Sequence, residues 1–379
     1  MIVPPYMLRR LARLDDPAMA PVVDAARRSL SLDGTFRDAR GGDARGGDVQ
    51  GGDVQGGDVQ VGESPPPTRA RGSATPGPRT PARASGVVER TISDAKQAES
   101  LPGVVVRREG EPDVSDVAVN EAYDGFGLTH ALFHDVYGRA SIDSADMPLE
   151  GTVHYGRQYD NAFWDGRRMV FGDGDGMVFR RFTASLSVIG HELTHGVMQY
   201  SANLAYQGQS GALNESVSDV FGALVEQHSM AQDVDEASWL IGVGLFTDEV
   251  EGNALRSLKA PGTAYDDDVL GIDPQPASMD EYIDTEDDNG GVHLNSGIPN
   301  RAFYLAAAAI GGKAWEGAGH VWYDTITTGD IRADSDFAQF AAATVEAAAA
   351  KFGEVSRERD SVADAWSTVG VAWEGETKK

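Results

Sequence analysis

A low-complexity segment near the N-terminus divides this chain into two unequal parts. From Gly41 the sequence runs through the pentapeptide GGDAR and three copies of GGDVQ, and then through a stretch rich in Pro, Arg, Ser and Thr that ends at about Gly86. Such a composition buries too little apolar surface to offset the entropy lost on ordering, and its period is far too short for a solenoid repeat. We therefore expect residues 41–86 to be a disordered linker between a short N-terminal piece, residues 1–40, and a long body.

The body is strongly acidic. The whole chain has a net charge of −27, but its first 85 residues carry 12 Lys and Arg against 10 Asp and Glu, which leaves −29 for the remainder. A surface of that sign repels nucleic acid and anionic membranes, because both bind through Lys and Arg, so we expect neither as a partner. The simplest role of the charge is solubility, with salt tolerance or basic substrates as alternatives.

The sequence offers no membrane span and no ordinary export signal. No run approaches the roughly 18 apolar residues of a transmembrane helix. Residues 1–10 lack the continuous apolar stretch of a standard signal peptide. Export by that route is therefore not supported.

A pair of histidines one helical turn apart suggests a metal site. The chain has no cysteine, so a metal must be held by His, Asp or Glu. The segment HELTH places His191 and His195 on one helix face with Glu192 beside them. A catalytic zinc ion needs a third protein ligand and an open position, and Glu215 on the next helical segment is the best candidate. Asp219, one turn further on, is suited to accept the free ring N–H of His191.

Hydrophobic periodicity changes along the body. Residues 153–176 show short apolar stretches broken by Gly and Asp, which predicts strands and turns. The later apolar positions follow helical spacing over residues 186–199, 213–228, 298–310, 314–325, 337–352 and 361–371. We expect an α+β fold with a mixed N-terminal lobe over residues 87–200, which includes the zinc-binding helix, and a helical C-terminal lobe over residues 201–379.

Five ordered motifs resemble the thermolysin-like zinc metallopeptidases, and specifically their protealysin-like branch. They are NAFWDG at 161–166, FGDGDG at 171–176, HELTHG at 191–196, GALNESVSDVFG at 211–222 and DNGGVHLNSGI at 288–298. Near the N-terminus, VPPYMLRR resembles the prosegment motif of that branch, which commonly lacks an ordinary signal peptide. The resemblance implies the two-lobed thermolysin-like fold, a zinc endopeptidase made as a proenzyme, and a prosegment that acts as intramolecular inhibitor or chaperone. It also implies a secreted monomer that acts on proteins or peptides, with accumulation in the cytoplasm as the alternative.

The resemblance also assigns roles to individual residues. One zinc ion would be bound by His191, His195 and Glu215. Glu192 would take a proton from the metal-activated water and deliver it to the leaving amine. The oxyanion would be stabilised by Tyr206 and by His293, which Asp288 would orient. The ligands would be supported from behind by Asn214 and Asp219.

The same resemblance implies how a substrate is held. Asn161 and Ala162 would bind its backbone, and Arg256 the carbonyl just after the cut. An apolar pocket would favour cleavage before bulky apolar residues; its walls would be Val188, Ile241 and Leu255. Nearby acids could favour Lys or Arg at neighbouring positions, although a solvated loop is the simpler role for them; they are Asp284, Glu286 and Asp287.

The paired calcium site of the thermolysin pattern is expected to be lost. Glu226 retains its acid, but four positions where acids would be expected carry Ser187, Ser238, Leu240 and Val243. A calcium ion requires six to eight oxygen ligands. We therefore expect one zinc ion and no double calcium site, and leave open a single calcium ion.

Two other functions fit these residues less well than an endopeptidase does. A catalytically silent binding protein with a structural metal would have no use for Glu192 as a base. A zinc hydrolase of non-peptide substrates would have no need of Asn161 and Arg256, which suit a peptide backbone.

Overall fold

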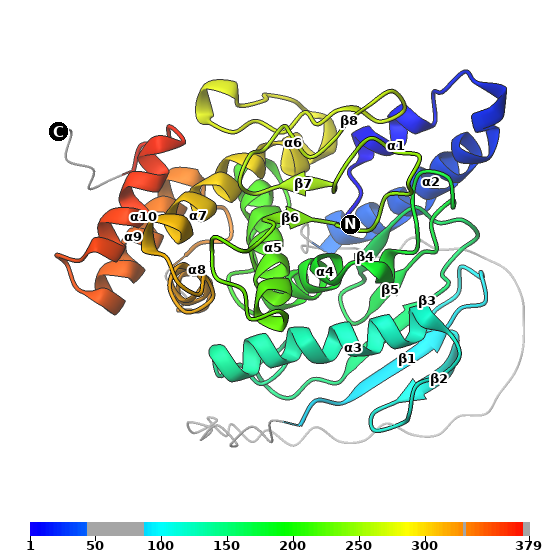
Figure 1. Ribbon diagram of the computed structural model, residues 1–379, viewed down its shortest axis with the longest axis horizontal. Helices are drawn as coiled ribbons and strands as arrows, with labels where there is room; N and C mark the ends of the chain where they lie inside the picture. Colours follow the sequence, from blue (N-terminus) through cyan, green and yellow to red (C-terminus); the bar gives the residue numbers. More distant parts are fainter. Residues whose placement is uncertain (44–86, 329–330, 374–379) are drawn as a thin grey trace, which may run out of the picture.

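The computed structural model describes residues 1–43, 87–328 and 331–373 (Figure 1). The expected linker lies outside the described residues, apart from its first three. None of the helices in the described ranges is long and apolar enough to cross a membrane.

A five-stranded mixed sheet forms the N-terminal lobe, in the order β2-β1-β3-β5-β4. Strands β1, β3 and β5 run parallel, whereas the outer strands β2 and β4 are antiparallel to their neighbours. The strands are β1 (Arg90–Asp94), β2 (Val104–Arg108), β3 (Leu149–Val153), β4 (Ala162–Trp164) and β5 (Met169–Phe171). Helix α3 (Val117–Ala131) packs against β1 and β3 and continues as a π-helical turn, Leu132–Val136. The strands and turns expected over residues 153–176 are therefore present.

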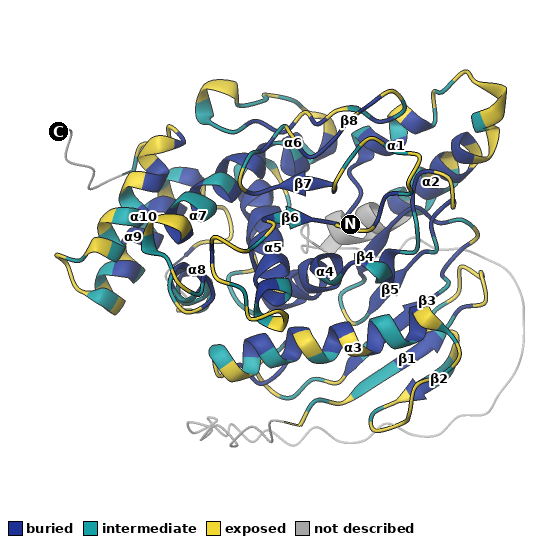
Figure 2. Ribbon diagram, in the orientation of Figure 1, coloured by how far each residue is buried: buried dark blue, intermediate teal, exposed yellow. Residues whose placement is uncertain are grey.

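Two buried helices join the lobes, α4 (Leu186–Gln199) and α5 (Gly208–Ser229) (Figure 2). They can cross closely because glycines face each other at the contact. A Cβ added at Gly190 would lie 3.0 Å from the Cα of Gly222, and one added at Gly222 would lie 2.5 Å from the Ser187 carbonyl oxygen. This close approach brings the two histidines of α4 to face Glu215 on α5.

Helices dominate the C-terminal lobe, as expected. They are α6 (Asp287–Asn295), α7 (Gly297–Ile310), α8 (Ala318–Thr327), α9 (Phe337–Phe352) and α10 (Arg357–Thr368). Short two-stranded ribbons complete the lobe: β6 (Leu240–Ile241) with β7 (Arg256–Ser257), and β8 (Asp266–Asp267) with β9 (Gly271–Ile272). The sequence did not predict α6, because Asp288 to Gly291 have positive φ angles and their Asn-Gly-Gly composition is typical of a turn.

The N-terminal segment packs on the body as an integral part of the fold. It contains α1 (Pro5–Leu11), a short 3₁₀ turn (Pro17–Met19) and α2 (Ala20–Asp43). Its apolar side chains join the main hydrophobic core, and Ile2, Val3, Leu8 and Leu11 have no exposed surface. Burial on this scale contributes about 1.5–3 kcal/mol for each large apolar side chain, so the docked position is strongly favoured.

Candidate active site

Three possible metal ligands converge between α4 and α5. His191, His195 and Glu215 each offer one ligand atom within 4.8 Å of the others, and all three side chains are buried. Each imidazole Nε2 lies 3.4 Å from one oxygen of the Glu215 carboxylate. Neither Nε2 nor Glu215 Oε2 has a hydrogen-bond partner among the described residues. Buried polar atoms seldom stay unpaired, and two imidazoles with one carboxylate are a common zinc-binding set, so these residues fit a zinc ion.

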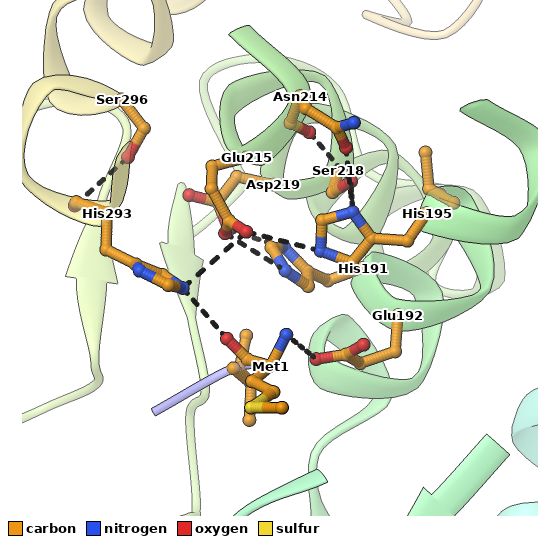
Figure 3. Close-up of polar contacts among 12 residues, drawn as sticks. Met1, His191, Glu192, His195, Asn214, Glu215, Ser218, Asp219, His293 and Ser296 are labelled. Atoms are coloured by element: carbon orange, nitrogen blue, oxygen red, sulfur yellow. Dashed lines mark hydrogen bonds and ion pairs between the residues drawn. The ribbon is translucent and has the colours of Figure 1, made fainter. Parts of the chain in front are cut away.

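The opposite ring nitrogens are held from behind (Figure 3). His191 Nδ1 lies 2.8 Å from Asp219 Oδ1, and His195 Nδ1 lies 2.8 Å from Asn214 Oδ1 and 3.1 Å from Ser218 Oγ. These partners fix the rings so that both Nε2 atoms point to the site. Burial lowers the pKa of His191 despite the nearby carboxylates, which favours the neutral form that binds metals.

Asp219 connects the metal site to Arg256 and Asn300. Its carboxylate accepts two hydrogen bonds from the Arg256 guanidinium, at 2.9 and 2.8 Å, and one from Asn300 Nδ2 at 2.8 Å. Burial opposes its ionisation, but Arg256 and His191 outweigh burial and lower the pKa of Asp219 to about 2. The carboxylate is therefore an anion that orients His191 and Arg256 together.

Glu192 has the surroundings of a base with a fixed orientation. Its Oε2 accepts a hydrogen bond from the Trp164 backbone N–H at 2.9 Å, and Oε1 lies 3.3 Å from the Met1 α-amino group. Burial opposes ionisation, but the positive α-amino group and the two imidazoles of α4 outweigh it, so the pKa of Glu192 is lowered. Glu192 is thus held as a carboxylate beside the candidate ligands.

His293 faces Glu192 across the cleft. Its Nδ1 lies 2.8 Å from Asp288 Oδ1, and its backbone N–H donates to Asp288 Oδ2 at 3.0 Å. Although burial lowers it, the carboxylates of Asp288 and Glu215 raise the pKa of His293 overall. Its Nε2 lies 3.3 Å from the Tyr206 hydroxyl, which donates a hydrogen bond to Glu215. The two donors therefore lie side by side at the edge of the metal site.

The first residues of the chain run through this cleft. His293 Nε2 lies 2.9 Å from the Met1 carbonyl oxygen, and the Ile2 N–H donates to the Ala162 carbonyl at 3.2 Å. Arg256 Nη1 donates to the Ile2 carbonyl at 3.0 Å. The Val3 N–H donates to Asn161 Oδ1 at 2.9 Å. The structure thus brings all the expected site residues together around one extended segment of the chain itself.

The three side chains expected to line an apolar pocket are all buried. Val188, Ile241 and Leu255 belong to the same hydrophobic cluster as Ile2. The acidic loop residues behave differently, since Asp284, Glu286 and Asp287 are not buried, and Asp287 pairs with Arg9 at 3.2 Å.

Residues of the N-terminal helix α2 also reach the site, which the sequence did not predict. Asp33 Oδ1 accepts a hydrogen bond from the Tyr159 hydroxyl at 2.5 Å, and Asp33 Oδ2 accepts one from Asn161 Nδ2 at 2.8 Å. Ser29 Oγ accepts one from the Asp160 backbone N–H at 2.9 Å. Ser218 and Asn300 were also missed. Ser218 could have been found, because it lies one helical turn beyond Asn214, whereas nothing near Asn300 in sequence points to Asp219.

The part of the chain that the structure describes contains no acid cluster for a calcium pair. In the described ranges, the zinc-type set is the one group of three or more His, Cys, Asp or Glu residues close enough to hold an ion. Glu226 Oε1 instead lies 3.5 Å from Ser238 Oγ, and burial raises the pKa of Glu226. Beside this one carboxyl group, Ser187, Ser238, Leu240 and Val243 supply no further carboxylate, so these residues do not fit a pair of calcium ions.

Comparison with known proteins identifies the family. The thermolysin metallopeptidase catalytic domain matches residues 99–199, and the thermolysin metallopeptidase alpha-helical domain matches residues 202–371. An extracellular metalloprotease of Pectobacterium carotovorum subsp. carotovorum is 54% identical over 287 residues, which cover 76% of this chain and 82% of that protein. Thermolysin of Alicyclobacillus acidocaldarius is 40% identical over 263 residues, which cover 68% of this chain and 46% of that protein.

A solved structure extends the similarity to the N-terminal segment. The precursor of protealysin from Serratia proteamaculans superposes with a TM-score of 0.81 at 46% identity and covers 98% of this chain and 99% of that chain. The expected protealysin-like resemblance, two-lobed fold and zinc-peptidase chemistry are thereby confirmed. The chain belongs to the thermolysin family of zinc metallopeptidases, in a precursor form similar to that of protealysin.

Proposed function

We propose that this proenzyme is kept latent by its own first residues, which occupy the cleft in the manner of a substrate. The observation that carries this proposal is the placement of the Met1–Ile2 peptide bond. Its carbonyl oxygen lies 2.9 Å from His293 Nε2, its N–H donates to the Ala162 carbonyl, and the next carbonyl accepts from Arg256. Residues 1–40 would then be the prosegment, residues 41–86 the linker, and residues 87–200 and 201–379 the two catalytic lobes.

The geometry supports a distinct role for each side chain in peptide hydrolysis. A zinc ion held by His191, His195 and Glu215 would supply Lewis-acid activation of a water molecule and of the scissile carbonyl. Glu192 takes the proton of the attacking water through Oε1 and passes it to the leaving nitrogen, while the Trp164 N–H holds Oε2 in place.

Charge on the carbonyl oxygen is stabilised from the opposite wall. Asp288 fixes the orientation of the His293 ring, and against the effect of burial Asp288 and Glu215 raise its pKa, which favours the protonated ring that donates from Nε2. Tyr206 supplies a second donor beside it. Donors that are already oriented stabilise developing charge without reorganisation, which is the main electrostatic requirement of amide hydrolysis.

The substrate-binding residues set direction and specificity. Asn161, Ala162 and Arg256 hold the backbone of the two residues after the scissile bond, as they hold Ile2 and Val3 here. The apolar side chain after the bond enters the pocket of Val188, Ile241 and Leu255. Cleavage before bulky apolar residues follows, because burying such a side chain contributes about 1.5–3 kcal/mol.

The location and the partners of the enzyme are also part of this proposal. Relatives from Pectobacterium and Serratia are named extracellular metalloproteases, which supports secretion of this chain as well. We propose that it acts as a monomer on protein and peptide substrates, with no nucleic-acid or membrane partner.

The latency is tested with two single substitutions in the full-length chain. The unmodified chain should hydrolyse an internally quenched peptide only after a lag, while its prosegment is still docked. Ile2→Asp places a charge at a fully buried site and should expel the prosegment, so that hydrolysis begins without this lag. Ala18→Asp, at an exposed prosegment position, should leave the lag unchanged. If both variants keep the lag of the unmodified chain, residues 1–3 do not cause latency.

Specificity is tested on the matured enzyme with quenched peptides that differ only in the residue after the scissile bond. Leu and Phe should be cleaved at least about tenfold faster than Asp or Lys. Equal rates would refute the pocket assignment.

A further inference from the structure

Beyond Val3, the prosegment continues across the body in the direction that a substrate takes after its cleaved bond. Helix α1 follows directly and lies beside the β8–β9 ribbon (Figure 1). Because Ile2 occupies the position just after the bond, Arg10 marks the ninth residue beyond the cut. The surface under α1 is therefore the surface that the downstream part of a long substrate would cross.

The Arg10 guanidinium lies against the turn between β8 and β9, an exposed place on this surface that we call the arginine pocket. Its Nε donates to the Val269 carbonyl at 2.8 Å, and its Nη2 donates to the Asp268 carbonyl at 3.3 Å. The flat group rests against Gly271, where an added Cβ would lie 2.9 Å from the guanidinium carbon. A Cβ at this place would press on the end of the Arg10 side chain, and the φ of 82° also favours glycine.

The pocket is built by the body and not by the prosegment. Asp267 Oδ1 accepts hydrogen bonds from the backbone N–H groups of Val269 and Leu270, each at 2.8 Å, and its Oδ2 accepts one from the backbone N–H of Glu251 at 2.8 Å. These bonds hold the turn between β8 and β9 in the shape that presents the two carbonyls. The arrangement can therefore persist after the prosegment has left.

Charge around the pocket favours a cation. Asp266, Asp267 and Asp268 are consecutive, and Asp287 pairs with Arg9 at 3.2 Å. Carbonyl oxygens accept strongly from a guanidinium, and the surrounding negative field raises the local concentration of basic segments. Because Arg10 is exposed to water, the contribution of the pocket is moderate.

We propose that, in the enzyme freed of its prosegment, this pocket is a distal substrate subsite that binds an arginine nine residues after the cleaved bond. It rests on the proposed function, because it takes the prosegment path as the path of substrate. The preferred substrates are then polypeptides with a basic segment downstream of an apolar cleavage position, and short peptides gain nothing from the pocket.

The test uses enzyme matured from the full-length chain and two quenched peptides. In both, an acetylated Gly-Ala-Met precedes the bond, and the following residues copy residues 2–14 of this chain. One peptide carries arginine at the ninth position and the other carries citrulline, which keeps the shape and loses the charge. We expect kcat/KM to be about fivefold higher for arginine, since a charged hydrogen bond at a partly exposed site contributes about 1 kcal/mol. Citrulline at the twelfth position, matching Arg13, whose side chain is exposed, should change kcat/KM less than about twofold.

Two glycine variants locate the effect. Gly271→Ala should reduce cleavage of the arginine peptide to the citrulline level and leave the citrulline peptide unchanged. Gly110→Ala is the matched control, because Gly110 has a similar positive φ (75° against 82°) but no atom within 4 Å of an added Cβ.

The results separate this inference from the proposed function. A peptide that ends three residues after the bond should be cleaved equally by all variants, and failure to cleave it would contradict the function itself. Equal cleavage of the arginine and citrulline peptides by the unmodified enzyme would overturn the subsite.

Discussion

Substitution of Asp33 tests the contact between the prosegment helix and the substrate-binding strand. Asp33 is fully buried, and its two oxygens accept hydrogen bonds from Tyr159 and Asn161. In Asp33→Ala, the Tyr159 hydroxyl and the Asn161 amide lose the carboxylate as acceptor while the prosegment is docked. Once the prosegment has left, water can accept from both groups. The substitution therefore penalises only the latent state.

The size of the effect follows from these two bonds. A hydrogen bond to a charged group contributes about 1.5–3 kcal/mol, and two bonds that share one carboxylate contribute less than their sum. We take about 3 kcal/mol for the pair, which lowers the ratio of docked to undocked prosegment about 150-fold. Asp33→Asn keeps one acceptor oxygen and should fall between Asp33→Ala and the unmodified chain.

The assay is the initial rate of peptide hydrolysis by full-length protein, with mass spectrometry to verify that the chain is still uncut. Asp24→Ala, at an exposed position of the same helix, is the control and should stay latent. If uncut Asp33→Ala is as latent as the control, the buried bonds do not hold the prosegment and the reasoning fails.

Three further predictions concern the body. His154 lies between Asp173 and Asp116, which raise its pKa to about 9 against the opposing effect of burial. Its contribution to the free energy of unfolding, at most about 3 kcal/mol, should be complete below pH 6.5 and lost as pH rises through 9. In urea unfolding of inactive Glu192→Ala protein, adding His154→Gln should remove this pH dependence; an unchanged dependence would contradict the assignment. Calcium chelation should leave the melting temperature within about 2 °C, and a larger fall would show that calcium binds. Gly222→Ala, whose Cβ would lie 2.5 Å from the Ser187 carbonyl, should lower zinc affinity by separating α4 from α5, whereas Gly311→Ala, at an open position, should not. Equal zinc affinity in both would refute the close-packing argument.

Local sequence patterns predicted most of the fold and most of the metal site. The histidine pair of α4 and the carboxylates of α5 were predictable because helical periodicity alone puts such residues on one face. Helices over 186–199 and 337–352 have the predicted bounds, and α9 begins at a capping box formed by Asp336 and Gln339. Helix α10 begins four residues earlier than predicted, at Arg357, because Ser356 caps it before the apolar pattern starts.

Contacts between residues far apart in the sequence could not be predicted from local sequence patterns. Asp33 and Asn161 are 128 positions apart, and neither the charge nor the spacing of Asp33 distinguishes it from other acids of the prosegment. The backbone path at Asp288 was likewise missed, since it depends on four successive residues with positive φ that place this carboxylate behind His293. The Asp33–Asn161 contact and the backbone path at Asp288 both depend on the tertiary structure, and neither produces a periodic pattern in the sequence.

The role of Glu192 at a zinc site is tested most directly by comparing the matured unmodified enzyme with the matured Glu192→Gln variant. Added trypsin cuts the linker of the variant, residues 41–86. Zinc content is measured by elemental analysis and hydrolysis with a quenched peptide that has Leu after the scissile bond. We expect one zinc ion in each protein. Hydrolysis by Glu192→Gln should be reduced about 10²–10⁴-fold, and a zinc chelator should abolish hydrolysis by the unmodified enzyme. Undiminished hydrolysis by zinc-loaded Glu192→Gln, or none by the zinc-loaded unmodified enzyme, would contradict this role.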